Sequence, residues 1–166
     1  MSKQIRNATV GDLDALIALN AQVQKLHNKL VPSHFRAATD EAEIRTFFAG
    51  VLATPHNHIL LSMSDGASPF GYLWFEVQHR PQTPFTHPPR RIYVHHVAVD
   101  KGARRRGIAS ALLLEMEKLA LSQGVRRIVL DTWVANREAQ DFFCANGFSP
   151  FNIVLEKSLE STAQIF

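Results

Sequence analysis

The sequence predicts a single α/β domain over residues 1–166, with a mixed, mostly antiparallel central sheet flanked by helices on both faces. The chain has 166 residues, which suits one domain with a sizeable core. Short apolar runs rich in β-branched residues alternate with longer segments whose apolar residues recur at helical spacing. Their order is strand, two helices, three strands, helix, strand, helix, strand, which is typical of a sheet covered by helices.

The first half of the chain contains recognisable helix boundaries. Thr9 suits an N-cap, because Asp12 follows three residues later as in a capping box. Pro32 ends the first helical pattern. A turn at 64–66 joins two strands into a hairpin. The predicted elements are a strand at 4–8, helices at 13–30 and 40–51, and strands at 58–63 and 70–77.

The second half begins with residues 79–90, which contain four prolines and read as an exposed loop. Two interpretations stay open for this loop, a wall of a substrate site or a solvated connection. Gly124 lies where a helix C-cap glycine is expected. The predicted elements are strands at 92–99 and 125–133, helices at 107–122 and 137–145, and a last strand at 151–155.

Composition and charge narrow the class of protein. Hydrophobic residues make up 46% and charged residues 20% of the chain, and the net charge is +3, whereas nucleic-acid-binding proteins usually have a stronger basic stripe. No apolar run reaches the ~18 residues needed to cross a bilayer. The single cysteine, Cys144, permits no internal disulfide. We therefore expect a cytoplasmic protein that binds neither nucleic acid nor membrane.

Three consecutive arginines, Arg104–Arg106, lie between Gly102 and Gly107 where a strand is followed by a helix. The first amides of a helix have no partners within it, so this turn suits an anion such as a phosphate. A nucleoside-triphosphate loop would need Lys and Ser or Thr where Ile108 and Ala109 stand. The remaining interpretations are a phosphate-binding turn and an exposed, solvated turn.

The wider sequence resembles the GCN5-related N-acetyltransferase (GNAT) family. Residues 104–109 fit its acyl-CoA loop pattern, Q/R-x-x-G-x-G/A, and residues 133–148 resemble its second signature. Residues 5–20 are similar to the family's first strand and helix, and residues 151–159 to its last strand. The second signature matches at Asn136, Ala139, Phe142, Gly147 and Phe148. The resemblance implies a GNAT-like acyl-CoA N-acyltransferase fold.

The resemblance also implies a site for acetyl-CoA as co-substrate. The amides of residues 105–110 would hold the pyrophosphate, and the backbone of Val97 and Val99 would bind the pantetheine arm. Asn136 would bind the same arm, and Phe143 would pack near the sulfur. In this family a bulge in the fourth strand commonly opens the groove. The expected cofactor-binding residues are Val97, Ala98, Val99, Arg104, Arg105, Arg106, Gly107, Ile108, Ala109, Ser110, Asn136 and Phe143.

Acetyl transfer to an amine requires a base, because an alkyl ammonium has a pKa near ~10.4. His95 takes the place of an acidic residue that the family often has, and a histidine suits this role. Strand alternation places His95 on one face with Tyr93 and Val97, and His96 on the other. Glu76 and His96 are further candidate bases. The alternative is that these histidines are structural residues of a core strand.

The departing thiolate needs a proton, and the chain differs from the family here. Phe143 stands where the family has a tyrosine that donates this proton, and a phenylalanine has none to give. Tyr93 is a candidate replacement, and the amide of Val97 is the expected donor to the thioester oxygen.

We therefore expect an acetyl-CoA-dependent N-acetyltransferase that acts by direct attack in a ternary complex and needs no metal. The acceptor would be a small-molecule or peptide amine, and a homodimer is expected from the resemblance. The alternative, motivated by Phe143, is a non-catalytic acyl-CoA-binding sensor or regulatory protein.

Overall fold

The computed structural model describes residues 4–63, 68–79, 81–87, 90–157 and 159. The predicted turn at 64–66 lies outside these residues. Two short 3-10 helices, at Val10–Asp12 and Lys101–Ala103, accompany the main elements. The main elements are β1 (Gln4–Asn7), α1 (Leu13–Leu30), α2 (Glu41–Ala53), β2 (Asn57–Met63), β3 (Gly71–His79), β4 (Arg90–Val99), α3 (Ile108–Ser122), β5 (Ile128–Val129) and α4 (Arg137–Ala145).

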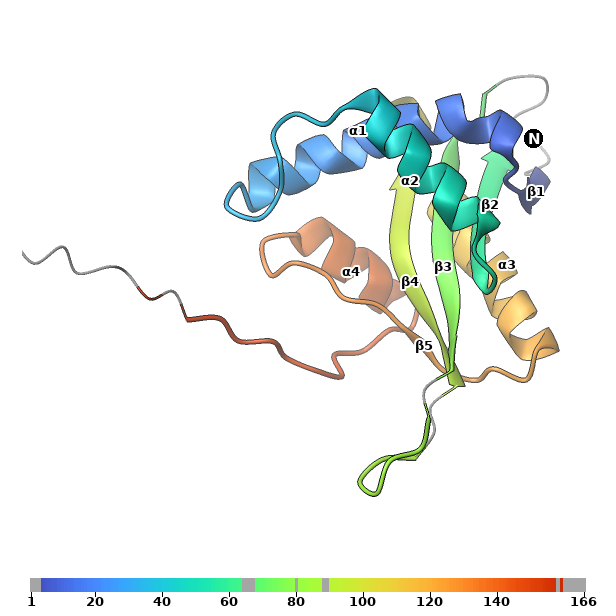
Figure 1. The fold of residues 1–166 in the computed structure, drawn as a ribbon, viewed down its shortest axis with the longest axis vertical. Helices are drawn as coiled ribbons and strands as arrows, with labels where there is room; N and C mark the ends of the chain where they lie inside the picture. Colours follow the sequence, from blue (N-terminus) through green and yellow to red (C-terminus); the bar gives the residue numbers. More distant parts are fainter. Residues whose placement is uncertain (1–3, 64–67, 80, 88–89, 158, 160–166) are drawn as a thin grey trace, which may run out of the picture.

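The strands form a sheet in the order β1-β2-β3-β4-β5 (Figure 1). The pairs from β1 to β4 are antiparallel, and β4 pairs with β5 in parallel. Helices α1 and α2 cover one face, whereas α3 and the aromatic residues of α4 pack on the other. The predicted mixed sheet with helices on both faces is therefore confirmed.

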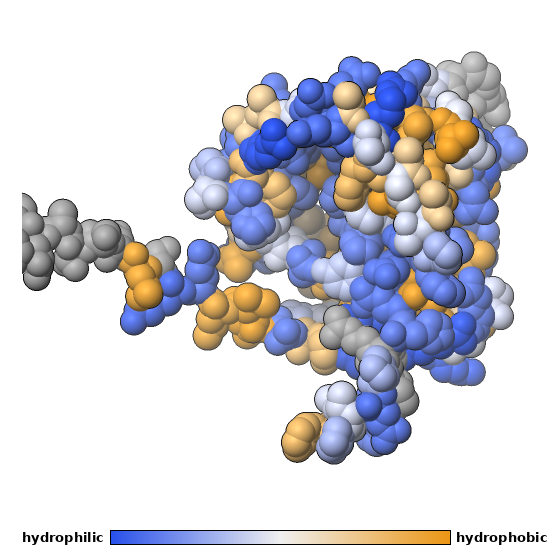
Figure 2. All heavy atoms as spheres, in the orientation of Figure 1, coloured by the Kyte–Doolittle hydropathy of each residue, from blue (hydrophilic) through white to orange (hydrophobic). Residues whose placement is uncertain are grey.

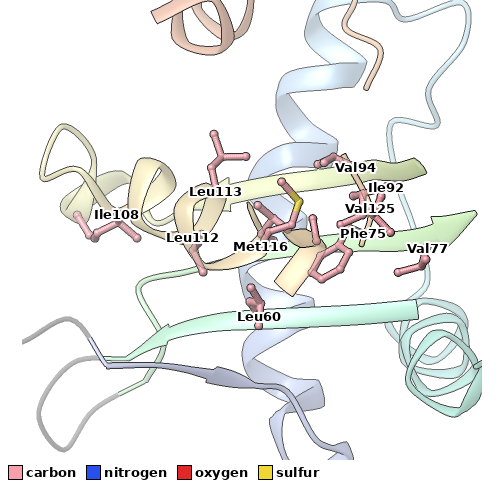
Figure 3. Close-up of a cluster of buried hydrophobic side chains, with 13 residues drawn as sticks. Leu60, Phe75, Val77, Ile92, Val94, Ile108, Leu112, Leu113, Met116 and Val125 are labelled. Carbon is pink, nitrogen blue, oxygen red and sulfur yellow. The ribbon is translucent and has the colours of Figure 1, made fainter. Parts of the chain in front are cut away.

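Each face of the sheet has its own apolar core. On one face, Leu112 and Met116 of α3 pack against Phe75 and Val94 of the sheet (Figure 3). On the other, Leu16 of α1 and Phe48 of α2 pack against sheet residues that include Tyr72 and Leu61. Burial of these side chains is the main favourable term that holds the helices to the sheet.

The ladder between β3 and β4 contains a β-bulge. Trp74 lies opposite His96, and Phe75 lies opposite Val94, so His95 has no residue opposite it. An extra residue of this kind bends the strand and shifts the alternation of side chains by one position. A bulge of the kind that is common in the resembled family, and that the sequence alone does not reveal, is therefore present in the middle of β4.

Strands β4 and β5 separate soon after they pair. Their only paired positions are Ile92 with Ile128 and Tyr93 with Val129. From His95 onward, β4 therefore has a partner strand only on the β3 side within the described part of the chain. The described ladder between β4 and β5 therefore ends at Tyr93 and Val129.

Most predicted elements are present with small shifts at their ends, and the predicted caps are confirmed. The Thr9 N–H donates to Asp12 Oδ2 at 2.8 Å. Gly124 has φ of 70° after the end of α3. This positive φ is favourable for glycine and strained for other residues.

One predicted strand is much too long, and another is wrong. The strand expected at 125–133 contains only Ile128–Val129, because the chain then diverges from β4 and loses its ladder. The strand expected at 151–155 has the residue pattern of a strand but no strand beside it, and these residues are exposed. A strand needs a neighbouring strand to hydrogen-bond its backbone N–H and C=O groups. The residue pattern alone was therefore not sufficient to predict a strand here.

Replacing Gly71 should test the close approach of β3 and β4. A Cβ atom at Gly71 would lie 2.5 Å from the backbone oxygen of Ala98. We expect Gly71→Ala to lower the free energy of unfolding by about 1–3 kcal/mol. The matched control is Gly50→Ala, since a Cβ at that exposed helical position meets nothing within 4 Å; it should raise stability by about 0.5–1 kcal/mol. Urea denaturation measures both, and equal midpoints for the two variants would contradict the register.

Candidate functional site

The bulge places two adjacent histidines on the same face of the sheet. The His95 ring stacks on Trp74 with centroids 4.1 Å apart, and its edge meets Tyr93 at 4.9 Å. The His96 ring also contacts Trp74, at 5.3 Å. The prediction that His96 faces away from His95 is wrong, as is the prediction that Val97 shares the face of His95, because Val97 packs against the α3 core.

His95 has an unusual polar environment. Its Nε2 lies 3.4 Å from Glu76 Oε2, but the contact lacks hydrogen-bond geometry. This nitrogen is buried and has no hydrogen-bond partner among the described residues. Burial lowers the pKa of His95, and the Glu76 carboxylate partly opposes that effect. The ring is therefore neutral near pH 7 and can accept a proton.

His95 and Glu76 open into a cavity of about 480 Å³. Its wall is partly aromatic, from Phe47 and Trp74, and partly polar. Trp74 Nε1 donates to Asn57 Oδ1 at 2.8 Å, which fixes the indole. The volume is typical of a small-molecule site. The lining residues are Thr46, Phe47, Gly50, Val51, Thr54, Asn57, Trp74, Glu76 and His95.

His96 belongs to a buried polar chain. Its Nδ1 lies 3.1 Å from the Tyr72 hydroxyl, which donates to Asn20 Oδ1 at 3.2 Å. Because the hydroxyl proton goes to Asn20, we assign the Nδ1–H of His96 as the donor to the Tyr72 oxygen. Burial, with smaller contributions from His27 and His95, lowers the pKa of His96 to about 4. His96 is thus held neutral in a structural network.

The turn before α3 leads directly into the N-terminus of that helix. Gly107, the N-cap of α3, has φ of 69°, and Arg105 has φ of 60°. No side chain caps α3, whereas Asp40 caps α2 and Asn136 caps α4. An uncapped helix N-terminus after such a turn is suited to a phosphate.

A second set of contacts connects this turn to α1. Asp100 Oδ1 accepts from the Gly102 N–H at 2.8 Å, and Asp100 Oδ2 accepts from Gln22 Nε2 at 2.9 Å. These bonds, the one from Gln22 most of all, hold the pKa of Asp100 below its usual value. Gln22 also accepts from the Lys101 N–H at 3.2 Å. The α1 helix therefore positions the arginine turn, a role that no sequence pattern indicated.

The other predicted coenzyme residues lie on β4 and at α4. Val97 and Val99 lie on β4 and are partly buried against the α3 core, whereas Ala98 faces α1 and α2. Asn136 Oδ1 accepts from the Ala139 N–H at 3.2 Å, so its NH₂ group is the part that could bind a ligand. Phe143 packs on the rings of its neighbours in the α4 region.

An aromatic cluster that joins two loops was missed by sequence reasoning. Trp133, which follows β5, contacts His34 at 4.7 Å and Phe35 at 5.2 Å between ring centroids. These contacts join the loop after α1 to the loop before α4. Trp133 is only partly buried. Hydrophobicity alone does not distinguish a core tryptophan from one that links two loops.

Two features are absent from the described part of the chain. No group of three or more His, Cys, Asp or Glu side chains there could hold a metal ion. No described helix is both long enough and apolar enough to cross a membrane.

The sequence pattern of the Acetyltransferase (GNAT) family matches residues 23–148, which is most of the chain. The chain belongs to this family. The matched region includes the bulge of β4, the arginine turn, α3 and α4.

The individual proteins to which the chain is similar share no more than 25% of their aligned residues with it. The chain is 25% identical over 108 residues to the uncharacterized N-acetyltransferase YycN of Bacillus subtilis (strain 168), and the match covers 65% of each protein. Two solved structures are also similar over nearly their whole length. The tetramutant of BH1408 from Bacillus halodurans has a TM-score of 0.89 at 22% identity, covering 94% of this chain and 99% of that one. AAC(6')-Iy in complex with the bisubstrate analog CoA-S-monomethyl-acetylneamine has a TM-score of 0.72 at 20% identity, covering 97% and 100%. These similarities confirm the GNAT-like fold.

His96 should make stability depend on pH. Its pKa is lowered in the folded state, so the unfolded chain binds more protons between about pH 6.5 and pH 4, and stability falls as pH falls through that window. Between pH 7 and pH 4.5, we expect the free energy of unfolding to fall by about 2–3 kcal/mol more in the wild type than in His96→Gln. The figure follows because a shift of one pKa unit corresponds to ~1.4 kcal/mol. Urea denaturation at both pH values measures this difference. Identical losses would show that His96 is not held neutral.

Proposed function

We propose that this protein is an acetyltransferase that transfers the acetyl group of acetyl-CoA directly to a primary amine. The observation that carries the proposal is the buried Nε2 of His95, which makes no hydrogen bond with the described residues, lies 3.4 Å from Glu76 Oε2 and belongs to the same cavity wall. Unsatisfied buried polar atoms are rare in folded proteins and call for an explanation. A role for His95 Nε2 in accepting a proton from the substrate would explain it.

Acetyl-CoA would bind along β4 and at the start of α3. The backbone amides of residues 105–110 and the arginines among them would hold the pyrophosphate. The pantetheine arm would lie beside β4 where that strand has no described partner on the β5 side, and bond to the backbone of Val97 and Val99. Asn136 would donate its NH₂ group to the arm, and Phe143 would pack near the sulfur.

The reaction moves one acetyl group and two protons. The bound ammonium loses a proton to His95 Nε2, directly or through one water, and Glu76 stabilises the imidazolium that forms. The amine nitrogen then bonds to the thioester carbon while the Val97 N–H donates to the carbonyl oxygen. Breaking the carbon–sulfur bond gives a thiolate, which is protonated to coenzyme A. As the amide forms, the nitrogen loses its second proton, which replaces the proton given to the thiolate, and His95 releases the first proton to solvent before the next cycle.

The proton for the thiolate must come from a group other than Phe143. Tyr93 is our candidate, because it contacts His95 on the face where the chemistry would occur. A phenol with an ordinary pKa near ~10 can donate to a thiolate whose own pKa is ~8.5 only if the two are close and water is scarce. Solvent is the other available donor.

The cavity favours a small amine with one positive charge. Glu76 is the only carboxylate among the described residues that line it, and Phe47 and Trp74 provide apolar and aromatic surface. Such a wall can bind an ammonium group through charge and cation–π attraction. A strongly polycationic acceptor would need more carboxylates. That AAC(6')-Iy binds a bisubstrate analog made from CoA and an acetylneamine supports a small-molecule acceptor for this fold.

Removing the arginine charges should weaken binding of acetyl-CoA. We expect a variant with Ala at Arg104, Arg105 and Arg106 to bind acetyl-CoA at least ~10-fold more weakly, since each charged hydrogen bond contributes about 1.5–3 kcal/mol. Isothermal titration calorimetry measures the Kd. The matched control is Lys118→Gln, an exposed charge within α3 and away from the turn, which should leave the Kd unchanged. No heat of binding for the wild type would reject the proposal, and tight binding without turnover on any amine would favour a sensor.

The role of His95 as the base can be tested by substitution and by the pH dependence of turnover. We expect His95→Gln to reduce kcat by about 100-fold or more. The matched control, His58→Gln, changes another partly buried histidine that stacks on an aromatic ring outside the cavity, and should retain activity.

In the wild type, kcat/KM should fall as pH decreases through the pKa of His95, which lies below 6.5. Because Glu76 raises that pKa, Glu76→Gln should move the acidic limb to lower pH; a shift to higher pH would contradict the assignment.

A further inference from the structure

A row of polar side chains leads away from the cavity along β3 and β4. Gln78 lies two residues after Glu76 on β3, and its partner on β4 is Arg91, two residues before Tyr93. Side chains two residues apart on a strand share a face of the sheet. Figure 2, which views the molecule from the side of α1 and α2, shows hydrophilic side chains where these strands run on below the helices. The polar part of the site therefore continues beyond the cavity wall, to which neither Gln78 nor Arg91 belongs.

Two hydrogen bonds fix the amide of Gln78. Arg91 Nε donates to Gln78 Oε1 at 2.9 Å, and Gln78 Nε2 donates to Glu76 Oε2 at 2.9 Å. A guanidinium only donates and a carboxylate only accepts, so one orientation of the amide satisfies both neighbours. All three side chains are partly buried, which limits competition from water. The NH₂ group of Gln78 is thus held toward Glu76.

The oxygen of Glu76 that Gln78 holds is also the oxygen that lies beside the base. Glu76 Oε2 is 3.4 Å from His95 Nε2, without hydrogen-bond geometry. A carboxylate that was free to turn would move toward the ring once the ring carried a proton, because a charge-assisted bond has a length of ~2.7–2.9 Å. The bond from Gln78 opposes this movement. Glu76 then stays close enough to stabilise positive charge on His95, but is not aligned to retain the proton.

Few other charged groups act on His95. Among the described residues that line the cavity, only Glu76 and His95 itself can titrate, since the lining residues from α2 and β2 are uncharged. Next to the cavity, Tyr93 contacts the ring of His95, and the Arg91 guanidinium lies 5.8 Å from the Tyr93 ring. The neighbouring His96 is neutral, because burial lowers its pKa to about 4. The negative charge beside His95 is therefore that of Glu76.

We propose that Gln78, held by Arg91, is a positioning residue that keeps the Glu76 carboxylate beside His95 without a closed hydrogen bond between them. The proton-accepting nitrogen of His95 then stays open for a substrate in the cavity. The inference rests on the proposed function, in which His95 is the base. The arrangement of the side chains belongs to the free protein, however, and is tested there without any reaction.

Titration of His95 by NMR tests the arrangement in the free protein. Gln78→Met removes both hydrogen bonds and keeps a side chain of similar length. We expect the titration of His95 to move to higher pH, because Glu76 then closes its bond to the protonated ring. The imidazole signal of His95 is the one that His95→Gln removes. The matched control, Gln4→Met at an exposed position of β1, should leave the titration unchanged. An unchanged or lower titration in Gln78→Met would overturn the proposal.

A double-mutant cycle shows whether Gln78 acts through Glu76. In a Glu76→Gln background, Gln78→Met should leave the titration of His95 where it is, because the carboxylate that Gln78 positions is gone. The same movement in both backgrounds would show that Gln78 changes the burial of His95, and would overturn the proposal. Gln78→Ala removes the same two bonds with a smaller side chain, should give the same results, and replaces Gln78→Met if circular dichroism shows that the latter does not fold.

Turnover separates this inference from the proposed function. In Gln78→Met, kcat/KM at pH 5.5 should fall about 3–10-fold relative to the wild type, and the loss should disappear toward pH 8, where His95 is unprotonated in both proteins. A loss of equal size at every pH would indicate a general structural defect and would overturn the inference. A wild type that acetylates no amine would reject the proposed function, whereas the NMR titration would still decide whether Gln78 positions Glu76.

Discussion

One extra residue in β4, His95, sets which side chains reach each face of the sheet. Before it, Ile92 and Val94 point to the α3 core; after it, Val97 and Val99 do so, and Ala98 faces α1 and α2. Without the extra residue, one of the two histidines would enter the α3 core, where a ring nitrogen without a partner is costly. A bulged strand also bends, which is consistent with the early separation of β4 from β5.

The positions of the helices and of the first four strands followed from the sequence, because apolar spacing reports which residues are buried. The bulge itself has no such signal, since polar residues at 95 and 96 are compatible with either register. The short length of β5 could not be predicted either. Val125 is apolar and buried beside α3, as a strand residue would be, but it lies outside the ladder. The cavity beside Glu76 combines residues from α2, β2, β3 and β4. Their meeting is a product of the tertiary fold, so only His95 and Glu76 were found in advance.

The arginine turn carries local backbone strain. Arg105 has φ of 60°, a conformation that costs a non-glycine residue roughly 1–2 kcal/mol. The surrounding structure must compensate, and the contacts that Asp100 makes with Gly102 and Gln22 are positioned to do so. Strain of this kind is concentrated at binding sites, where it directs backbone amides toward a ligand. The strain and the missing side-chain cap of α3 therefore point to the same use of the turn.

The opening between β4 and β5 has a consequence for stability. Two paired positions hold the strands together, and one backbone bond, from the Ile92 N–H to the Arg127 carbonyl at 2.9 Å, precedes them. So short a ladder leaves β5 dependent on the packing of Ile128 and Leu130 against the α3 core. A ligand that bonded to the backbone of β4 beyond Tyr93 would add hydrogen bonds where the ladder ends, and would stabilise the folded chain in proportion to its affinity.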